Sequence, residues 1–473
     1  MEQFYRTNYK FIKKEPFIIA NEDLTEDGLL KPEKLKDFIL LNENRRIRYE
    51  ELENLYLNNV NIFYQKDKES YKPDNRIAIP FAKYLVDVFN GYFAGVPLKV
   101  NYDDRDDETD DRNINQAISE FWNRNSMDDS FYELSRLTSI YGHAYLYMWQ
   151  NEEAKTDTYW CTPKDTFVIY DNSIRPKALF GVKYSKNEEG NFIGELLMPS
   201  LKVHFSESNS TFKMSYDTAE ELYYPELPII EFVENENRMG LLEGVETLIN
   251  HYNKAISEKA NDVDYFADAY LAVVGMELDE ESIRMLRDNR TINLYGTGTD
   301  KVNIEFLAKP SGDNTQENLL DRLERLIYQT SMVVNLNDEK FGTSSGIALE
   351  LKMQSMQNLA KTKQNKFSKG FNTLFKNFFA IITNGIEANK KDDWINLDYT
   401  FTLNLPKNIE NEVQVARDLE GMVSQKTQLS VLSIVDNVSD EIEQMGMENE
   451  FNRSSDFESL GFNFSKNEEK EDE

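Results

Sequence analysis

A stretch of glycine and serine at residues 342–346 (GTSSG) matches the pattern G-x-S-x-G, in which a serine can act as a nucleophile. In hydrolases with this turn, the catalytic histidine follows the serine in the chain and takes its proton. The three histidines of this chain, His143, His204 and His251, all precede the motif. The residues before it also have helical rather than strand periodicity. We therefore predict that this turn has no catalytic role and that the histidines are structural.

A second candidate for chemistry is the acidic stretch Asp103–Asp111 (DDRDDETDD), which holds seven carboxylates and one arginine. Clustered carboxylates can bind calcium or magnesium, so a metal-dependent enzyme is one hypothesis. However, the spacing differs from that of an EF-hand loop, and blocks of like charge are usually solvated, which favours an exposed loop. The sequence also lacks a G-x-x-x-x-G-K-[ST] phosphate loop, an H-E-x-x-H motif and paired cysteines. We predict no catalytic residue, no metal and no cofactor.

The charge balance limits the partners of this chain. It has 473 residues, 84 of them acidic and 53 basic, for a formal net charge of −31. Such a protein is not expected to wrap nucleic acid by neutralising phosphates, although an acidic wall could surround DNA without gripping it. The single cysteine, Cys161, excludes an internal disulfide framework. Residues 1–20 are unlike a signal peptide, and Lys83, Asp87 and Asn90 interrupt the most apolar window, so no membrane span is expected.

Periodicity predicts an α+β fold. Apolar spacing indicates a helix from Pro32, another around Tyr49–Tyr56, one within residues 75–100, and two more between Ile114 and Leu137. From residue 144 the period changes to two, and tight turns between short strands predict a mostly antiparallel sheet. The predicted strands are Ala144–Trp149, Phe167–Asp171, Ala178–Ser185, Lys202–Ser206, Thr211–Tyr216, Pro228–Val233 and, later in the chain, Trp394–Leu405.

Two helices with narrow apolar stripes follow a boundary near Glu234–Gly240. The stripes consist of Ile249, Tyr252, Ile256 and Val263 on the first helix, and of Leu319, Leu323 and Leu326 on the second. A stripe with heptad spacing predicts lengthwise packing on a neighbour, which could be another subunit or another part of the same chain. Between these helices, the pattern of residues 271–313 predicts a small insertion that contains short strands and a helix around Glu280–Arg287.

A polar loop, Asn335–Gly346, separates the second striped helix from a much longer one that begins at Ile347. The first turns of the long helix are polar, and a wide apolar face follows. This face consists of Phe367, Phe371, Leu374, Phe375, Phe378 and Ile382. Two amphipathic helices are predicted between Glu410 and Met445. The acidic end of the chain, residues 452–473, is expected to be disordered.

Five motifs resemble, in collinear order from about residue 35 to 450, the portal proteins of tailed double-stranded DNA bacteriophages of the siphophage type. They are NRIAIPFAKYLVDVFNGYFAGVPLKV (75–100), YGHAYLYMW (141–149), FVIYD (167–171), LPIIEFVENENRMGLLEGVETLINHYN (227–253) and FGTSSGIALELKM (341–353). The resemblance implies the portal fold, which has a mixed α/β wing with an antiparallel sheet, long stem helices, a small α/β clip and a helical crown.

The resemblance also implies how these parts divide the chain. The parts are a wing at 1–240, a stem helix at 241–270, the clip at 271–313, a second stem helix at 314–334, a tunnel loop at 335–346, the long helix and return strand of the wing at 347–406, and the crown at 407–451. The acidic tail at 452–473 departs from the family, because it is longer than the crown needs. The stripes of the stem helices would then face neighbouring subunits.

The function implied by the resemblance is that of a ring, typically a dodecamer, at one vertex of the virion capsid. The ring would be a conduit for double-stranded DNA during packaging and ejection. It would assemble in the host cytoplasm, and no membrane is expected among its partners. It would bind the terminase large subunit, then the head-completion adaptor, and also the major capsid and scaffold proteins. An acidic structural or scaffold-binding oligomer without DNA passage remains an alternative.

Two groups of site residues also follow from the resemblance. The loop that lines the DNA tunnel would present Asn337, Asp338, Glu339, Lys340, Phe341, Thr343, Ser344 and Ser345. The clip would dock the motor and the adaptor through Glu280, Glu281, Arg284 and Arg287.

Overall fold

The computed structural model describes most of the chain up to residue 404 and part of the remainder. The described residues are 14–69, 72–103, 112–209, 211–267, 271–274, 303–306, 313–336, 346–404, 409–432, 434–435, 438, 441–442 and 444–447. Contacts within the chain divide it into two compact units, Met1–Asn404 and Leu405–Glu473. In the part of the chain that the structure describes, no helix is both long and apolar enough to span a membrane.

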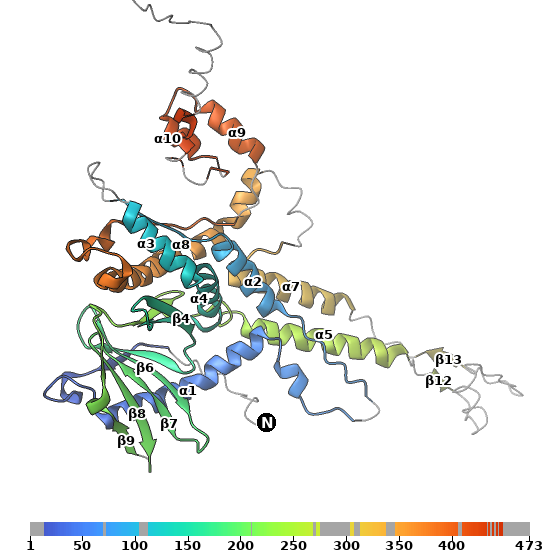
Figure 1. The fold of residues 1–473 in the computed structure, drawn as a ribbon. Helices are drawn as coiled ribbons and strands as arrows, with labels where there is room; N and C mark the ends of the chain where they lie inside the picture. The colour runs from blue at the N-terminus through green and yellow to red at the C-terminus, as the bar shows by residue number, and fades with distance from the viewer. Residues whose placement is uncertain are drawn as a thin grey trace, which may run out of the picture. The chain divides into compact units, whose positions relative to one another are not determined.

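The larger sheet of the first unit has seven strands and carries the long N-terminal helix α1 (Pro32–Tyr56) on one face (Figure 1). The strand order is β1-β5-β6-β7-β8-β10, with β9 also paired to β8, and all pairs are antiparallel except β1 with β5. The strands are β1 (Phe17–Ile19), β5 (Thr166–Asp171), β6 (Ala178–Lys186), β7 (Phe192–Leu197), β8 (Leu201–Ser208), β9 (Thr211–Met214) and β10 (Glu220–Glu221).

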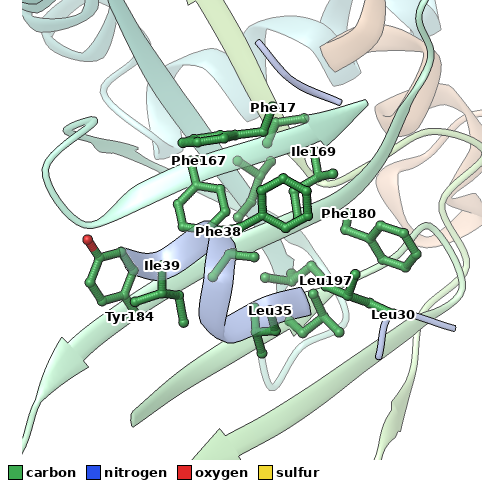
Figure 2. Close-up of a cluster of buried hydrophobic side chains, with 14 of the residues drawn as sticks. Phe17, Leu30, Leu35, Phe38, Ile39, Phe167, Ile169, Phe180, Tyr184 and Leu197 are labelled. Carbon is green, nitrogen blue, oxygen red and sulfur yellow. The ribbon is translucent and has the colours of Figure 1, made fainter. Parts of the chain in front are cut away.

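The core between α1 and this sheet is apolar because both elements place one face of their period toward it. Leu35, Phe38 and Ile39 of the helix are buried against Phe167 and Phe180 of the sheet (Figure 2). Phe17 from β1 adds its ring at 4.9 Å from that of Phe167. This contact attaches the N-terminal strand to the edge of the sheet.

A second sheet of three strands, in the order β11-β3-β4, is covered by helices. Its strands are β3 (His143–Gln150), β4 (Thr156–Cys161) and β11 (Ile229–Val233), and the nearby helices are α2 (Phe81–Ala94), α3 (Arg112–Arg124) and α4 (Met127–Tyr141). The 35-residue helix α8 (Gly346–Ala380) packs on β11. Gly370 makes this close approach possible, since a Cβ there would lie 2.6 Å from the Phe232 ring.

Three further pieces complete the first unit. Helices α5 (Glu246–Ala267) and α7 (Asp313–Ser331) run side by side, and strands β12 (Leu271–Val274) and β13 (Asn303–Phe306) pair antiparallel in the segment between them (Figure 1). Strand β2 (Lys99–Tyr102) pairs with β14 (Leu397–Thr400). The second unit contains α9 (Ile409–Asp418) and α10 (Gln425–Leu429), which are joined by a hydrogen bond from Gln428 to the Ala416 carbonyl.

The α+β fold class predicted from the sequence is confirmed, but several boundaries were wrong. The consecutive strands between residues 143 and 233, predicted as one sheet, are divided between two sheets, and β1, β2, β4, β7 and β10 were not predicted. The two helices expected between Pro32 and Tyr56 are one, because no glycine or proline interrupts them and Asn42 continues the buried stripe through a hydrogen bond to the Pro163 carbonyl.

The end of the long helix and the strand that follows also differ from expectation. Helix α8 ends at Ala380, and Ile382, predicted on its apolar face, lies in a 3-10 turn and is 68% exposed. The strand predicted over Trp394–Leu405 is confined to Leu397–Thr400, because its first residues form a 3-10 turn. The helix predicted around Glu280–Arg287 lies outside the described residues.

Candidate channel and assembly elements

Helices α5 and α7 form an antiparallel hairpin that is held at both ends. At the base, Phe81 of α2 places its ring 4.9 Å from that of Tyr252 and 6.0 Å from that of Tyr328, in edge-to-face contacts. Toward the β12–β13 end, Lys259 pairs with Glu317, and Gln316 donates to Asp262 at 2.9 Å. The apolar contacts near the base and the polar contacts near the far end fix which residues of the two helices lie level with each other.

A second contact runs along another face of α5. Three buried side chains of the helix, Asn253, Ser257 and Asn261, accept hydrogen bonds from the backbone amides of Ile79, Ile77 and Asn75, at 3.0, 2.9 and 2.6 Å. The spacing of four on a helix advances about 6 Å. Two residues of extended chain advance about 6.6 Å, so successive rungs stay nearly in step. We call this set of contacts the polar ladder.

The base of α5 is tied to the N-terminal part of the chain by ion pairs. Lys14 Nζ lies 2.8 Å from Glu243 Oε2, and both side chains are almost completely buried. Burial lowers the pKa of Lys14 to about 8, although the Glu243 carboxylate acts in the opposite direction. Arg48 of α1 donates to Glu246, in the first turn of α5, at 2.8 Å. The helix therefore starts from a fixed point in the core.

Next to this point lies a buried polar cluster centred on Glu231 of β11. Arg238 donates to both of its carboxylate oxygens at 2.7 and 2.6 Å, and the Tyr170 hydroxyl donates at 2.6 Å. His143 Nδ1 lies 2.8 Å from Glu231 Oε1, and its Nε2 lies 2.8 Å from the Tyr49 hydroxyl. Burial lowers the pKa of His143 to about 4, despite the neighbouring carboxylate. Both ring nitrogens of His143 are thus in contact with neighbouring side chains of the buried cluster.

Helix α8 carries a lysine in its core. Lys363 is fully buried, and its ammonium lies 2.7 Å from Glu234 Oε2, 2.8 Å from the Ser135 carbonyl and 2.8 Å from the Ser139 hydroxyl. The rings of Phe89, Phe93 and Phe367 surround it at 5.2, 5.2 and 5.5 Å. Burial lowers its pKa, and Glu234 opposes that effect. These contacts fix α8 against α4 and the loop after β11.

The segment between α7 and α8 is anchored on both sides. Beyond the end of α7, the Leu336 amide donates to the Tyr84 hydroxyl at 2.9 Å. From α8, the Ser355 hydroxyl donates to the Met332 carbonyl at 3.3 Å. A hollow of about 660 Å³ lies here, lined by Asp321, Glu324, Arg325, Tyr328, Gln329, Val333, Val334, Asn335 and Lys352. These contacts hold the residues after α7 against α2 and against α8.

These elements occur in a chain whose likeness to known proteins is extensive. The model of the family described as phage portal protein, SPP1 Gp6-like, matches residues 36–453. The chain belongs to this family of phage portal proteins. The match covers the hairpin, the segment between its helices, α8 and the C-terminal helices.

Relatives of this portal subunit are distant in sequence. The portal protein of Clostridium phage phiCD119 is 21% identical over 399 residues, which cover 79% of this chain and 85% of that protein. Similar solved structures include the neck of an empty GTA particle computed with C6 symmetry and that of a native particle computed with C12 symmetry. Their TM-scores are 0.44 and 0.46, and both are 12% identical and cover 75% of this chain and 90% of the other.

The predicted interface residues of the portal subunit differ in exposure. Ile249 is 1% exposed and packs inside its own subunit, so we correct its assignment to the surface between subunits. Val263 and Leu319 are 62% and 49% exposed. The remaining stripe residues, Tyr252, Ile256, Leu323 and Leu326, are half-buried. Part of each stripe is thus used within the hairpin, which was the other interpretation of the heptad spacing.

The other predicted sites of the portal subunit fall mainly outside the described residues. These are the tunnel-loop residues Asn337–Ser345 and the clip residues Glu280, Glu281, Arg284 and Arg287. Of the acidic stretch, Asp103 alone is described, and its amide donates to the Asn396 carbonyl at 3.3 Å. Among the described residues, no group of three or more potential ligands could hold a metal ion.

Sequence reasoning missed the residues that attach the hairpin to the wing. Lys14, Lys363 and the three side chains of the polar ladder were not singled out. The ladder had a detectable signal, because Asn253, Ser257 and Asn261 recur every fourth residue on a helix, away from its apolar stripe. The sequence contains no such signal for Lys14 and Lys363, because their partners Glu243 and Glu234 lie far away in the sequence.

Proposed function

We propose that this portal subunit forms a closed ring at the capsid vertex, through which double-stranded DNA passes during packaging and ejection. The observation that carries the proposal is the hairpin α5–α7 with its β12–β13 insertion, in a chain that the portal family model matches over residues 36–453. The net charge of −31 also suits a conduit, because an acidic wall repels phosphate and leaves the polymer free to slide.

The loop between α7 and α8 is the proposed DNA contact. Its residues 337–345 include Asp338 and Glu339, which repel phosphate, and Lys340, which attracts it. Its neutral members Asn337, Phe341, Thr343, Ser344 and Ser345 offer weak contacts. The contacts of Leu336 with Tyr84 and of Ser355 with the Met332 carbonyl support this assignment, because they hold the described residues on both sides of the loop to neighbouring helices.

The same proposal assigns functions to the clip, the wing and the subunit interface. The clip, with Glu280, Glu281, Arg284 and Arg287, docks the terminase large subunit and later the head-completion adaptor. The wing contacts the major capsid and scaffold proteins. Val263 and Leu319 contribute to the subunit interface, together with the accessible parts of the half-buried stripe residues. The ring is a dodecamer of the virion that assembles in the host cytoplasm, and the subunit itself has no enzymatic activity.

Electron microscopy of the purified protein tests the ring directly. Rings with a central hole are expected, whereas monomers that turn over a substrate with divalent metal would refute the proposal and favour a metal-dependent enzyme. Deleting Glu280–Arg287 should abolish docking of both motor and adaptor and leave rings intact. Docking that survives the deletion would place the docking site elsewhere.

DNA passage needs a separate test. Replacing Asp338 and Glu339 together by lysine should leave ring assembly and motor docking normal and slow packaging, most strongly at low salt, because added positive charge attracts phosphate. The matched control exchanges both residues for asparagine and glutamine, which removes the repulsion without adding attraction. Wild-type packaging rates in the lysine variant would remove the loop from the DNA path. Rings whose heads never take up DNA would favour an acidic structural oligomer.

A further inference from the structure

The solvent-exposed face of α8 differs in charge from the rest of the chain. From Leu351 to Ala380 this helix contains six lysines and no acidic residue, although the whole chain has 84 acidic and 53 basic residues. Its exposed residues recur mostly at intervals of three and four, which places them on one face about 27 Å long. They are Gln354, Asn358, Lys361, Thr362, Asn365, Lys369 and Asn372. We call this set the donor face.

Most side chains of the donor face have no partner within the subunit. Thr362 is the exception, because its hydroxyl donates to the Asn358 carbonyl at 3.1 Å. The ammonium groups of Lys361 and Lys369 and the amide groups of the asparagines and the glutamine form no hydrogen bond or ion pair with any residue that the structure describes. Ammonium groups only donate, and amide groups can donate, so all six of these side chains offer N–H donors to a ligand.

One carboxylate lies beside the donor face. Glu236, in the loop after β11, pairs with Lys366 of α8. Lys366 and, to a smaller extent, Lys369 hold the pKa of the Glu236 carboxyl group below its ordinary value. These two lysines together exceed the single negative charge of Glu236. Lys361 lies about two turns away on the same face, so the donor face keeps a net positive charge.

The exposed face of α1, the other long helix of this unit, has a different composition. Its exposed charged residues are Glu33, Asp37 and Glu50, which are all acidic, and Leu40 and Leu41 are also exposed. On α8, no large apolar side chain is exposed between residues 352 and 380. The positive charge and the polarity of the donor face are therefore specific to α8.

The donor face suits the backbone of DNA better than a protein surface. Protein interfaces have an apolar centre with aromatic anchors, and this face offers no exposed apolar side chain. Phosphate and sugar oxygens accept hydrogen bonds from lysine, asparagine and glutamine side chains, independently of the base sequence. Lys361 and Lys369 lie about 12 Å apart along the helix, which matches the width of the major groove of B-DNA. Each lysine can therefore reach the phosphates of one strand.

We propose that the donor face of α8 is a contact surface for the backbone of double-stranded DNA, with Lys361 and Lys369 bound to phosphates on the two sides of the major groove. This inference rests on the proposed conduit and extends it, because α8 begins directly after the loop that is proposed to contact DNA. Two exposed ammonium groups per subunit give a weak attraction that salt screens easily. The contact can therefore guide the polymer along the helix without holding it.

Photo-crosslinking in packaged heads tests this contact. The one cysteine of the chain, Cys161, is buried, so a thiol-reactive photo-crosslinker attaches selectively to a cysteine introduced at the surface. Asn365→Cys places the crosslinker in the middle of the donor face, and Ser344→Cys places it in the loop. Lys213→Cys, at an exposed position of β9, is the control. DNA adducts are expected for Asn365→Cys and Ser344→Cys at several times the yield for Lys213→Cys.

Removing the two ammonium groups tests their role in the contact. Adding Lys361→Gln and Lys369→Gln to Asn365→Cys should lower the yield of DNA adducts several-fold, whereas adding Lys213→Gln instead should leave it unchanged. With two phosphate contacts per subunit, the yield for Asn365→Cys should also fall about tenfold between about 50 and 200 mM salt. Far-UV circular dichroism checks that each variant folds.

The possible results separate this inference from the proposed function. Adducts of Asn365→Cys with protein rather than DNA would assign the face to another partner and overturn the inference. It would also be overturned by a DNA yield equal to that of Lys213→Cys, or by a yield that the two glutamine substitutions leave unchanged. DNA adducts for Ser344→Cys without any for Asn365→Cys would overturn the inference and leave the proposed function intact. Rings that take up no DNA in any variant would refute the proposed function and this inference together.

Discussion

Replacing Lys363 by methionine should destabilise the portal subunit strongly, because it leaves the Glu234 carboxylate buried without its cation. The side chains of Lys363 and Glu234 are 0% and 5% exposed. Removing one partner from such a pair costs about 3–5 kcal/mol, since the remaining charge loses its compensation. The loss includes the hydrogen bonds to the Ser135 carbonyl and the Ser139 hydroxyl. Methionine has a similar length and fills the aromatic surroundings, so little of the effect comes from a cavity.

The assay is urea unfolding followed by circular dichroism, at one protein concentration for all variants. The double variant Lys363→Met/Glu234→Gln removes both charges and should recover most of the lost free energy of unfolding, because apolar or neutral replacements of a buried pair are often nearly neutral. Lys361→Met, two residues away on the exposed side of α8, is the matched control and should change little. A cost below about 1 kcal/mol for Lys363→Met, or a double variant as unstable as the single, would refute the reasoning.

Three other predictions concern His143, Ser257 and Gly142. The pKa of His143 is lowered to about 4, so on acidification the unfolded chain takes up a proton at this residue before the folded chain does. The free energy of unfolding should therefore fall by roughly 3 kcal/mol between pH 6.5 and pH 4. Urea unfolding measured against pH should show a smaller fall for His143→Gln, and a fall equal to that of the wild type would contradict this. Ser257→Ala leaves the Ile77 amide without its acceptor and should cost roughly 1–3 kcal/mol, with faster hydrogen exchange at Ile77 as the measure. Gly142→Ala should lower the thermal unfolding temperature far more than Gly28→Ala. Both glycines have a positive φ, but a Cβ at Gly142 would lie 1.9 Å from the Arg238 carbonyl oxygen, whereas no atom lies within 4 Å of a Cβ at Gly28. Equal decreases in the two variants would disprove the clash.

Much of the fold could be predicted because it depends on local periodicity. The paired helices α5 and α7, the short strands and the long helix α8 all follow from the spacing of apolar residues. Strands β4 and β7 could not be predicted in this way. The first contains polar residues at Thr156 and Asp157, and the second contains Gly194, so neither has the apolar alternation of a typical strand.

The contacts that anchor the candidate site were beyond sequence reasoning for a different reason. Lysine is normally a surface residue, and Lys14 and Lys363 are buried only because carboxylates from distant segments meet them. Likewise, Ile249 and Val263 belong to one stripe in the sequence, yet one is inside the subunit and the other is exposed. An apolar stripe indicates that a helix packs on another element. The tertiary structure determines which residues of the stripe are buried within the subunit and which remain exposed.

The polar ladder on α5 also has a built-in length limit. Each step of four helical residues advances about 6.0 Å, and each step of two extended residues about 6.6 Å, so the two scales drift apart by about 0.6 Å per rung. Three rungs tolerate this mismatch, and a longer series would lose its hydrogen-bond geometry. The next amide in the extended segment would belong to residue 73, which is a proline and has no N–H to donate. The ladder of backbone amides therefore stops at Asn75, and the segment before Pro73 contacts the helix through a side chain instead, because Lys68 pairs with Glu258.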